Sequence, residues 1–467
     1  MKRAGFSCAV LTAAALMTLG SAATAFAGEW VAEGTEWRYL ENNGTYAADS
    51  WETDNGVSYY IGSDGYMLRN TLIEDNENYY YVRSSGAMLV NEWRFLENPE
   101  WQGDEWVGEG SWYYFGANGR AVRTTGDKVR IEEIGGKRYA FDQYGRMMTG
   151  WISESGEYVT EDNWEEGLYY ADPAGSGDLI TNNWLLLSVP DADNEEDDYP
   201  SYYFYFSSNA KKAMDTERTI GGKDYLFDSR GVTQYGWHQD DDEAQSWRYF
   251  GTIEDPYMRT GWFEAIPDEN LDSDDYNDGN SRWYYSSSNG RIVTSEFKTI
   301  DGKTYAFNST GERITGLKVI TLDGENSKTI TGVSSVDYLD DIPQGEDATT
   351  NVFYFNSDGT VKTGKVSIDI DGTNYDFSFR SSGSPRGAGV MGIDDNKIYD
   401  HGRCLTAEED TKYQIVSWDD KQYLVNESGT IQKNRKNLKD ADGYYYCTNK
   451  DGTLLHGPLD DRCEEKH

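Results

Sequence analysis

Residues 134–151 read IGGKRYAFDQYGRMMTGW, and residues 220–237 read IGGKDYLFDSRGVTQYGW. Each stretch places a short aromatic strand before a turn that ends in a glycine, at Gly145 and at Gly231. Asp, Asn, Ser and Gly are the residues that allow the positive φ angles of a tight hairpin turn. We therefore expect each stretch to form a β-hairpin, with the aromatic strand before the turn and a second strand after it.

The same pattern recurs along the chain, and such a repeat decides the fold class. Alignment on the turn glycine gives 14 copies, of which 12 carry Tyr or Phe six residues before the anchor position. Several copies carry an apolar residue two positions after the anchor, among them Met67, Met88 and Met147. The anchor positions are Gly44, Gly65, Gly86, Gly119, Gly145, Gly175, Ala210, Gly231, Glu254, Gly290, Gly311, Gly359, Gly429 and Gly452. The Tyr or Phe before the anchor is expected in the core, against the neighbouring hairpin.

One such hairpin is not stable alone in water, but hairpins stacked on one another can bury their aromatic faces. Tyr (36), Trp (15) and Gly (49) are abundant and Pro (9) is scarce, which is typical of short strands joined by tight turns. We therefore predict an all-β solenoid, or superhelix, of about 14–16 short hairpin repeats. Helix signals are absent after the first residues of the chain.

The first 27 residues are predicted to be an export signal. Lys2 and Arg3 precede the apolar run Cys8–Leu19, and Ala25-Phe26-Ala27 supplies the small-residue pattern for cleavage after Ala27. The run is too short to span a bilayer, and no later segment approaches the length of a membrane helix. We expect a secreted protein that is held at the cell surface by something other than a membrane span.

The predicted mature chain is divided into three parts. Residues 28–317 form a Trp-rich repeat array, residues 318–350 an irregular insertion, and residues 351–467 a degenerate repeat array. Of the 15 Trp residues, 14 lie before residue 284, with only Trp418 after it. Packing alone would use Trp equally in the later copies, so ligand binding is expected in the Trp-rich part.

The net charge of −40 excludes nucleic acid as a partner, because the chain repels phosphates and attracts cations and basic partners. Aromatic residues make up 14% of the chain, which is unlike a disordered acidic chain. The acidic runs 191–198 and 239–243 are predicted to be solvated loops, with contact to a protein partner or weak calcium association as alternatives.

Three cysteines remain after the predicted cleavage, namely Cys404, Cys447 and Cys463. An exported protein can form a disulfide, and an odd number leaves one thiol over. The sequence leaves the pairing open. No pair has the C-x-x-C spacing of a zinc or redox site.

Two further stretches extend the pattern: residues 110–122 read GSWYYFGANGRAV, and residues 300–316 read IDGKTYAFNSTGERITG. Together with the two stretches quoted first, they resemble the choline-binding, or cell-wall-binding, repeats of Gram-positive surface proteins. The last stretch also resembles the repeats of glucan-binding proteins and clostridial toxins. The resemblance covers residues 30–317 closely and 351–467 more loosely. It implies a hairpin superhelix that binds teichoic-acid choline or a wall polysaccharide.

The resemblance also implies a ligand site between successive hairpins, walled by a Trp after glycine, a strand Trp and a ring of the next hairpin, often over a Met. Ring faces suit a quaternary ammonium group, which cannot donate a conventional hydrogen bond. The residues carried over are Trp151, Trp237 and Trp262 after glycine, Trp112, Trp247 and Trp283 on strands, and Met258. The most compact site is expected where Trp237 and Trp247 are closed by Trp262 and backed by Met258. The sequence departs from the family here, since 10 residues separate Trp237 from Trp247 and 21 separate Trp262 from Trp283.

Catalytic and metal motifs are absent from the sequence. The four His residues are scattered without the H-E-x-x-H spacing, and no segment outside the repeats could house a catalytic cleft. Residues 274–279 are similar to a calcium loop, but Tyr276 and Tyr285 stand where ligands would be needed. We therefore predict a protein that is not an enzyme and that needs no metal or cofactor.

Three functional hypotheses follow. The first is a secreted cell-wall-binding protein that recognises choline-type cations or wall glycans through aromatic sites between repeats. The second is an extended glucan binder whose rings stack on sugar faces. The third is a structural or adhesive surface spacer without a small-molecule ligand.

Overall fold

The computed structural model describes residues 28–97, 110–190, 200–240, 246–345 and 347–463. In these residues the chain forms twelve two-stranded sheets, two three-stranded sheets and one five-stranded sheet, all antiparallel. Helical structure is limited there to α1 (Ser273–Asp278) and to the 3₁₀ helices η3 (Glu161–Glu166) and η4 (Leu339–Asp341). The prediction of an all-β chain built from small hairpins is confirmed. The predicted export signal, residues 1–27, lies outside the described residues.

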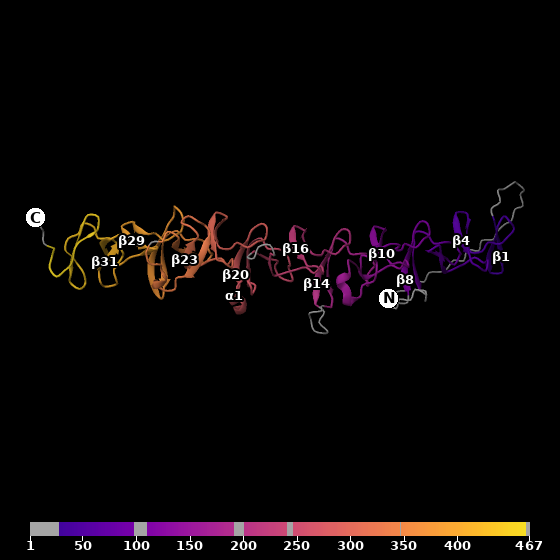
Figure 1. Cartoon of the computed structure of the whole chain (residues 1–467), viewed down its shortest axis with the longest axis horizontal. Helices are drawn as coiled ribbons and strands as arrows, with labels where there is room; N and C mark the ends of the chain where they lie inside the picture. The colour runs from indigo at the N-terminus through magenta and orange to yellow at the C-terminus, as the bar shows by residue number, and fades with distance from the viewer. Residues whose placement is uncertain (1–27, 98–109, 191–199, 241–245, 346, 464–467) are drawn as a thin grey trace, which may run out of the picture. The chain divides into compact units, whose positions relative to one another are not determined.

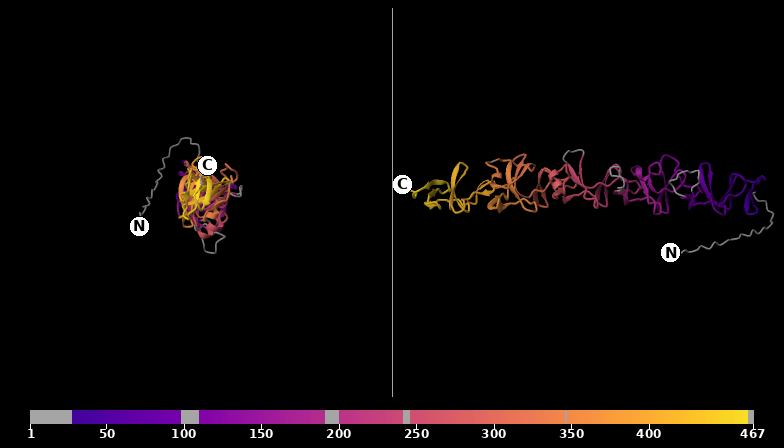
Figure 2. Two further views of the ribbon diagram at one scale, coloured as in Figure 1. Left: turned by 90° about the vertical axis from the view of Figure 1, so that its left-hand side faces the viewer. Right: turned by 90° about the horizontal axis from the view of Figure 1, so that it is seen from below.

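The chain divides into two compact units. The first takes in the described residues up to Met214 together with Ser229–Val232. Its hairpins follow one another in chain order, as the colour gradient shows (Figures 1 and 2). Its strands are β1 (Glu29–Glu33), β2 (Glu36–Leu40), β3 (Ser50–Asp54), β4 (Val57–Ile61), β5 (Thr71–Asp75), β6 (Asn78–Val82), β7 (Glu92–Glu97), β8 (Gly110–Phe115), β9 (Arg130–Ile134), β10 (Lys137–Phe141), β11 (Gly150–Ile152), β12 (Tyr169–Ala171), β13 (Asn183–Ser188) and β14 (Ser201–Phe206).

The second unit takes in Asp215–Asp228 and the described residues from Thr233 onward. Its first strands also pair as successive hairpins, and its later strands form the larger sheets. Its strands are β15 (Thr216–Ile220), β16 (Lys223–Phe227), β17 (Trp237–Gln239), β18 (Trp247–Tyr249), β19 (Gly261–Ala265), β20 (Arg282–Ser286), β21 (Glu296–Ile300), β22 (Lys303–Phe307), β23 (Gly316–Leu322), β24 (Ile330–Ser335), β25 (Thr350–Phe355), β26 (Gly364–Ile370), β27 (Thr373–Phe379), β28 (Gly392–Asp394), β29 (Lys397–Asp400), β30 (Arg403–Cys404), β31 (Tyr413–Trp418), β32 (Lys421–Asn426), β33 (Leu438–Lys439), β34 (Tyr445–Thr448) and β35 (Leu454–Leu459).

In the hairpin β9–β10 the tight turn lies before the aromatic strand, which corrects the predicted placement after it. Strands β9 and β10 pair along their whole length and are joined by Gly135-Gly136, whose φ angles are 63° and 81°. Two successive residues with positive φ form the turn whose twist matches that of the paired strands. The turn that ends at Gly145 is followed only by a single bridge between Phe141 and Met147, because the chain then leaves for the next hairpin.

The aromatic strand buries the ring that lies six residues before the anchor position. Tyr113 and Tyr284 are fully buried, and Tyr139 is 8% exposed. Tyr113, Tyr284 and the equivalent Tyr305 belong to three separate small hydrophobic clusters and not to one large core. The predicted core role of this position is confirmed, and the stability of the hairpins comes from local contacts between neighbours.

Residues 318–350, which we expected to be an irregular insertion, contain regular β structure. Strand β23 pairs with β24 on one side and with β25 on the other. The apolar residues of these strands alternate between two clusters, with Ile320 in one and Val319 in the other. Both faces of β23 are therefore covered, and the segment widens a hairpin into a three-stranded sheet.

The acidic insertion before β20 is helical, which differs from the expectation of no helix after the first residues. Asp272 caps α1, since its side chain accepts a hydrogen bond from the backbone N–H of Asp275. Arg282 on β20 donates to the Asp275 carboxylate, with the Nε···Oδ2 distance at 2.5 Å. These hydrogen bonds to Arg282 lower the pKa of Asp275. The carboxylates of this insertion thus cap and anchor a short helix.

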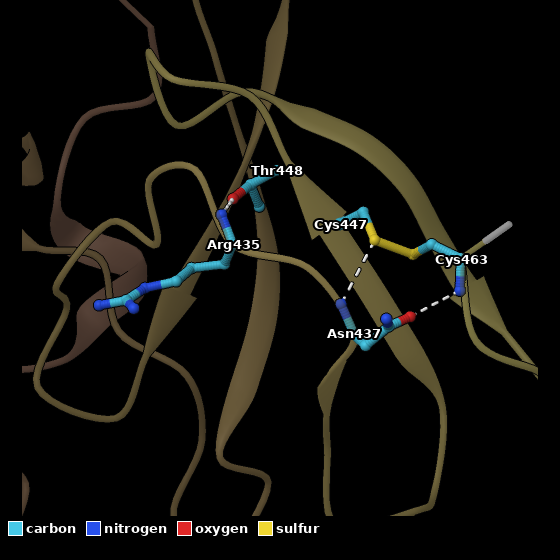
Figure 3. Close-up of a disulfide and its surroundings, with 5 residues drawn as sticks. All are labelled: Arg435, Asn437, Cys447, Thr448 and Cys463. Carbon is cyan, nitrogen blue, oxygen red and sulfur yellow. Dashed lines mark hydrogen bonds between the residues drawn. A yellow bond between two sulfur atoms is a disulfide. The ribbon is translucent and has the colours of Figure 1, made fainter. Parts of the chain in front are cut away.

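A disulfide joins Cys447 on β34 to Cys463 (Figure 3). Asn437 contacts both cysteines: its backbone N–H points at the Cys447 sulfur, and its side-chain oxygen accepts from the Cys463 backbone N–H at 2.7 Å. Cys404 is a free, buried thiol, and its burial raises its pKa. The pairing that the sequence leaves open is thus Cys447 with Cys463.

Candidate functional site: an aromatic pocket between hairpins

At six places in the described residues, a Trp on the first strand of one hairpin contacts a ring of the next hairpin; four of these contacts lie in the first unit and two in the second. The contacted ring is always the one six residues before the anchor position. In each pair the ring centroids lie 4.8–5.3 Å apart and the ring planes meet at 61–75°. The pairs are Trp30 with Tyr59, Trp51 with Tyr80, Trp93 with Tyr139, Trp151 with Phe204, Trp237 with Tyr284 and Trp262 with Tyr305. We call each such contact a seam.

A backbone hydrogen bond closes each seam. We call the residue two positions after the anchor the post-turn residue. Its backbone N–H donates a hydrogen bond to the carbonyl of the residue that lies seven positions before the preceding anchor. For Met147 the acceptor is Trp112, at 2.7 Å. The equivalent bonds run from Met67 to Trp37, Met88 to Ser58, Lys212 to Leu168, Ile292 to Trp247 and Arg313 to Trp283. The post-turn side chain is thereby fixed beside the two rings of its seam.

The seam of Trp93 and Tyr139 opens into a cavity of about 640 Å³ in the first unit. Three of its walls are the rings of Trp93, Trp112 and Tyr139, which come from β7, β8 and β10. The thioether of Met147 and the ring of Tyr158 also line the cavity. The rest of the lining is backbone and small side chains, from residues 173–177 and from Gly110, Ser111 and Thr149.

The wall of small residues follows from packing. Gly177 has a φ of 72°, and a Cβ at this position would overlap the terminal methyl group of Met147. Trp112 is 45% exposed, whereas Tyr139 is 8% exposed. The cavity therefore has a buried inner ring and an accessible outer ring, which suits a ligand that arrives from solvent.

A carboxylate lies next to this cavity. The Asp178 side chain accepts a hydrogen bond from Lys137 at 3.0 Å, and it also contacts Ser176, which lines the cavity. Burial raises the pKa of Asp178, but the hydrogen bonds from Ser176 and Lys137 outweigh it and hold the pKa below its ordinary value. Asp178 therefore stays ionised at neutral pH and forms an ion pair with Lys137 beside the cavity.

The structure distributes six of the seven predicted site residues, all but Met258, over four seams. Trp112 lines the open cavity, and Trp151 is a buried core residue at 5% exposure. Trp237 and Trp247 lie together on β17 and β18 with ring centroids 6.5 Å apart. Trp262 and Trp283 share the hairpin β19–β20.

The structure differs from the expectation that Trp262 closes the site of Trp237 and Trp247. The ring that lies against Trp237 from the next hairpin is Tyr284, at 4.9 Å, whereas Trp262 packs with Tyr305 in the following seam. Met258 is buried, and a Cβ on Gly290 would overlap its sulfur. The alternation of side chains along β19 explains this, because Phe263 faces the Trp237 cluster and its neighbour Trp262 must face away.

Sequence reasoning missed Trp93, which follows Glu92 and not a glycine. A spacing signal was present: Trp51 and Trp93 each lie seven residues after an anchor glycine, at Gly44 and Gly86. This is the place where the first strand of the next hairpin begins. Spacing from the anchor therefore identifies these two Trp residues, which the preceding residue does not.

The structure describes the two acidic runs that were predicted to be solvated loops only in part. Residues 191–198 and most of 239–243 lie outside the described residues. Asp240, which is described, bonds Arg248 at 2.7 Å and Arg291 at 3.0 Å. Across the described ranges, no group of three or more His, Cys, Asp or Glu side chains is arranged to hold a metal ion. In the same residues, no helix has the length and apolar character needed to cross a membrane.

The seams define a class of protein that is built from aromatic hairpin repeats packed against one another. The particular type is the choline-binding repeat, since residues 48–93 match the family model of that description. The match runs from just before β3 to Trp93 itself and confirms the resemblance drawn from the sequence. Residues 48–93 are therefore similar to a choline-binding repeat.

Two curated relatives are glucosyltransferases. The chain is 28% identical over 262 residues to glucosyltransferase-S of Streptococcus mutans serotype c, which covers 56% of this chain and 14% of the relative. It is 24% identical over 299 residues to glucosyltransferase-I of Streptococcus downei, which covers 54% of this chain and 16% of the relative. The chain thus spans only a small part of the length of these relatives.

Solved structures from Streptococcus pneumoniae are also similar. The modular autolysin LytC, in complex with a synthetic peptidoglycan ligand, is 24% identical, with 64% of this chain and 56% of that chain covered and a TM-score of 0.36. Choline binding protein F is 20% identical, with 79% of this chain and 100% of that chain covered and a TM-score of 0.36.

Proposed function

We propose that this chain is a secreted, non-catalytic cell-wall-binding protein that takes a choline-type quaternary ammonium group into the cavity of Trp93, Trp112 and Tyr139. The observation that carries the proposal is the lining of that cavity, in which three rings and the Met147 thioether converge. A quaternary ammonium group needs ring faces and no hydrogen-bond acceptor, and each desolvated ring contact contributes about 2 kcal/mol. Three such contacts are enough for a site in the millimolar to micromolar range.

The charge of the chain supports a cationic ligand. The net charge of the chain is −40. A negative field raises the local concentration of cations and speeds their association. Weak sites on one chain combine through effective concentration when the ligand is repeated along a wall polymer such as teichoic acid.

Several finer points belong to the same proposal. Successive seams form a superhelical array, and residues 1–27 direct export, so that the protein acts at the surface of a Gram-positive-type bacterium. Nucleic acid is not a partner, and a protein partner at the acidic loops remains part of the alternative in which the repeats are a spacer. Binding of a glucan is the second candidate function, favoured by the 45% exposure of Trp112, because an exposed ring face can stack on a sugar.

The test is a titration of the full chain with choline, in which Trp fluorescence and calorimetry detect binding. We expect saturable binding that Trp93→Ala and Trp112→Ala each weaken by about 30-fold, the equivalent of about 2 kcal/mol per ring. Elution from a choline-substituted matrix by free choline supports the proposal. Retention on dextran or another glucan, unaffected by choline and lost in Trp112→Ala, supports the second candidate and contradicts the first.

A further inference from the structure

One seam of the first unit contains a cation of the chain's own. The Nζ atom of Lys212 lies 4.9 Å from the ring centroid of Trp151, 5.3 Å from that of Trp164 and 5.8 Å from that of Phe204. An ammonium group within about 6 Å of a ring centroid is attracted by the ring face. Lys212 is only 4% exposed, so its ammonium group meets three rings in a site largely closed to water.

This seam has the same construction as the open cavity. Lys212 is the post-turn residue, and its N–H donates to the Leu168 carbonyl as that of Met147 donates to Trp112. Trp151 meets Phe204 at 5.3 Å and 75°, close to the 4.8 Å and 68° of Trp93 and Tyr139. The two seams therefore differ chiefly in the post-turn side chain and in the source of the third ring.

The third ring comes from the 3₁₀ helix η3. Leu168 stands where the open cavity has Trp112, and Trp164 supplies the missing ring from Glu161–Glu166. Trp164 is 2% exposed, and its indole N–H donates to the Pro190 carbonyl at 2.8 Å, which fixes the ring. The Lys212 ammonium also donates to the Glu165 carbonyl on the same helix, at 3.3 Å.

A second seam, in the other unit, follows the same rule. Arg313 is the post-turn residue there, and its guanidinium carbon lies 5.9 Å from the Trp262 centroid and 5.5 Å from the Trp283 centroid. The Arg313 Nε atom is buried and has no hydrogen-bond partner within the described part of the chain. The Nη2 atom of the same guanidinium donates to the Ser357 carbonyl at 3.3 Å, and the group occupies the place beside the two Trp rings that a ligand cation would take.

We propose that the post-turn residue decides whether a seam is open to a ligand or filled from within, and that Lys212 is the built-in occupant of the Trp151–Trp164–Phe204 seam. A Met at this position leaves room for an external cation, as in the Met147 cavity. A Lys or Arg places its own charge over the rings and excludes the ligand. The inference rests on the proposed function only in its choice of ligand class.

The experiment counts choline sites in the full chain by calorimetry. Lys212→Met is expected to add one site to the number found for the wild type, and Met147→Lys to remove one. Lys211→Met is the matched control, because the neighbouring Lys211 is 40% exposed and bonds Glu154 at 3.1 Å without contacting the rings. It loses the same charge and is expected to leave the number of sites unchanged. Lys212→Ala serves as a second opening variant, and near-ultraviolet circular dichroism shows whether each variant keeps its Trp packing.

The outcomes separate this inference from the proposed function. If the wild type binds choline and neither Lys212→Met nor Lys212→Ala, both folded, gains a site, the inference is wrong and the proposed function stands. If the wild type binds none and Lys212→Met binds one equivalent, the inference stands and the open cavity has another ligand. If no variant binds choline, both are wrong.

Discussion

The indole of Trp93 meets the ring of Tyr139 with centroids 4.8 Å apart and planes at 68°, although the two residues belong to successive hairpins. This edge-to-face contact sets the angle between two walls of the cavity before any ligand arrives. Trp93 also lies 5.2 Å from Tyr114 on its own hairpin and 5.7 Å from Phe141 on the next. The inner wall is therefore preorganised, which reduces the cost of ordering it on binding.

Alanine substitution of two different Trp residues should affect choline binding in one case and folding stability in the other. Trp112→Ala is expected to weaken choline binding by about 30-fold with a loss of unfolding free energy below about 1 kcal/mol, because Trp112 is 45% exposed. Trp151→Ala is expected to lower the unfolding free energy of the first unit by about 3–5 kcal/mol, because Trp151 is 5% exposed among Trp164 and Phe204. Urea unfolding and choline titration of both variants check this, and equal destabilisation by the two would contradict the assigned roles.

Two glycines with similar backbone conformations should respond differently to alanine. Gly302, with a φ of 77°, has nothing within 4 Å of an added Cβ, so Gly302→Ala is expected to cost about 1 kcal/mol of backbone strain. Gly290, with a φ of 81°, faces the Met258 sulfur, so Gly290→Ala adds about 1–3 kcal/mol of overpacking to the same strain. Urea midpoints measure the difference. A loss for Gly302→Ala as large as that for Gly290→Ala would show that the anchor glycine is needed only for its φ angle.

Thiol labelling should report one free cysteine. In the chain without residues 1–27, denaturation without reductant is expected to expose a single reactive thiol, Cys404, and reduction two more, Cys447 and Cys463. In the native protein Cys404 should react slowly, because it is 4% exposed and burial raises its pKa, which lowers the thiolate fraction. Mass spectrometry after iodoacetamide treatment counts the labels. Three labels before reduction would exclude the disulfide.

Much of the fold could be predicted from the sequence, because turn residues and aromatic positions are local signals. The anchor glycines and the rings six residues before them located the aromatic strands correctly. The order of turn and strand was wrong, because Gly135-Gly136 and Gly145 are equally good turn signals in the sequence. Only the register, in which β9 pairs with β10, shows which turn closes the hairpin.

The candidate site could be predicted only in part. Trp112 was identified from its strand, but Trp93, on the other strand of the same hairpin, was missed because it follows Glu92 and not a glycine. Lys212 gave no signal at all, because a charged residue breaks the apolar pattern after the anchor position. Its burial depends on Trp164, which an insertion brings into the seam.

The ion pair of Asp275 with Arg282 should give part of the second unit a pH-dependent stability. Hydrogen bonds from Arg282 lower the pKa of Asp275 below its ordinary value, so the folded state favours the ionised carboxylate. Its contribution is fully present above the pKa of the unfolded state and is lost as the pH falls through the lower folded pKa. Asp275→Asn is therefore expected to cost about 1 kcal/mol at pH 7 and progressively less in acid.

The matched control for this prediction is Asp274→Asn, which removes the same charge from an exposed position in the same helical turn. Glu312, whose pKa is raised by burial, also faces Arg282 at 3.6 Å, but both variants retain it and its titration cancels in the comparison. Urea midpoints of the wild type and of both variants at pH 7, 5 and 3 measure the effect. Equal losses for the two variants at every pH would mean that general charge repulsion, and not the pair with Arg282, stabilises this helix.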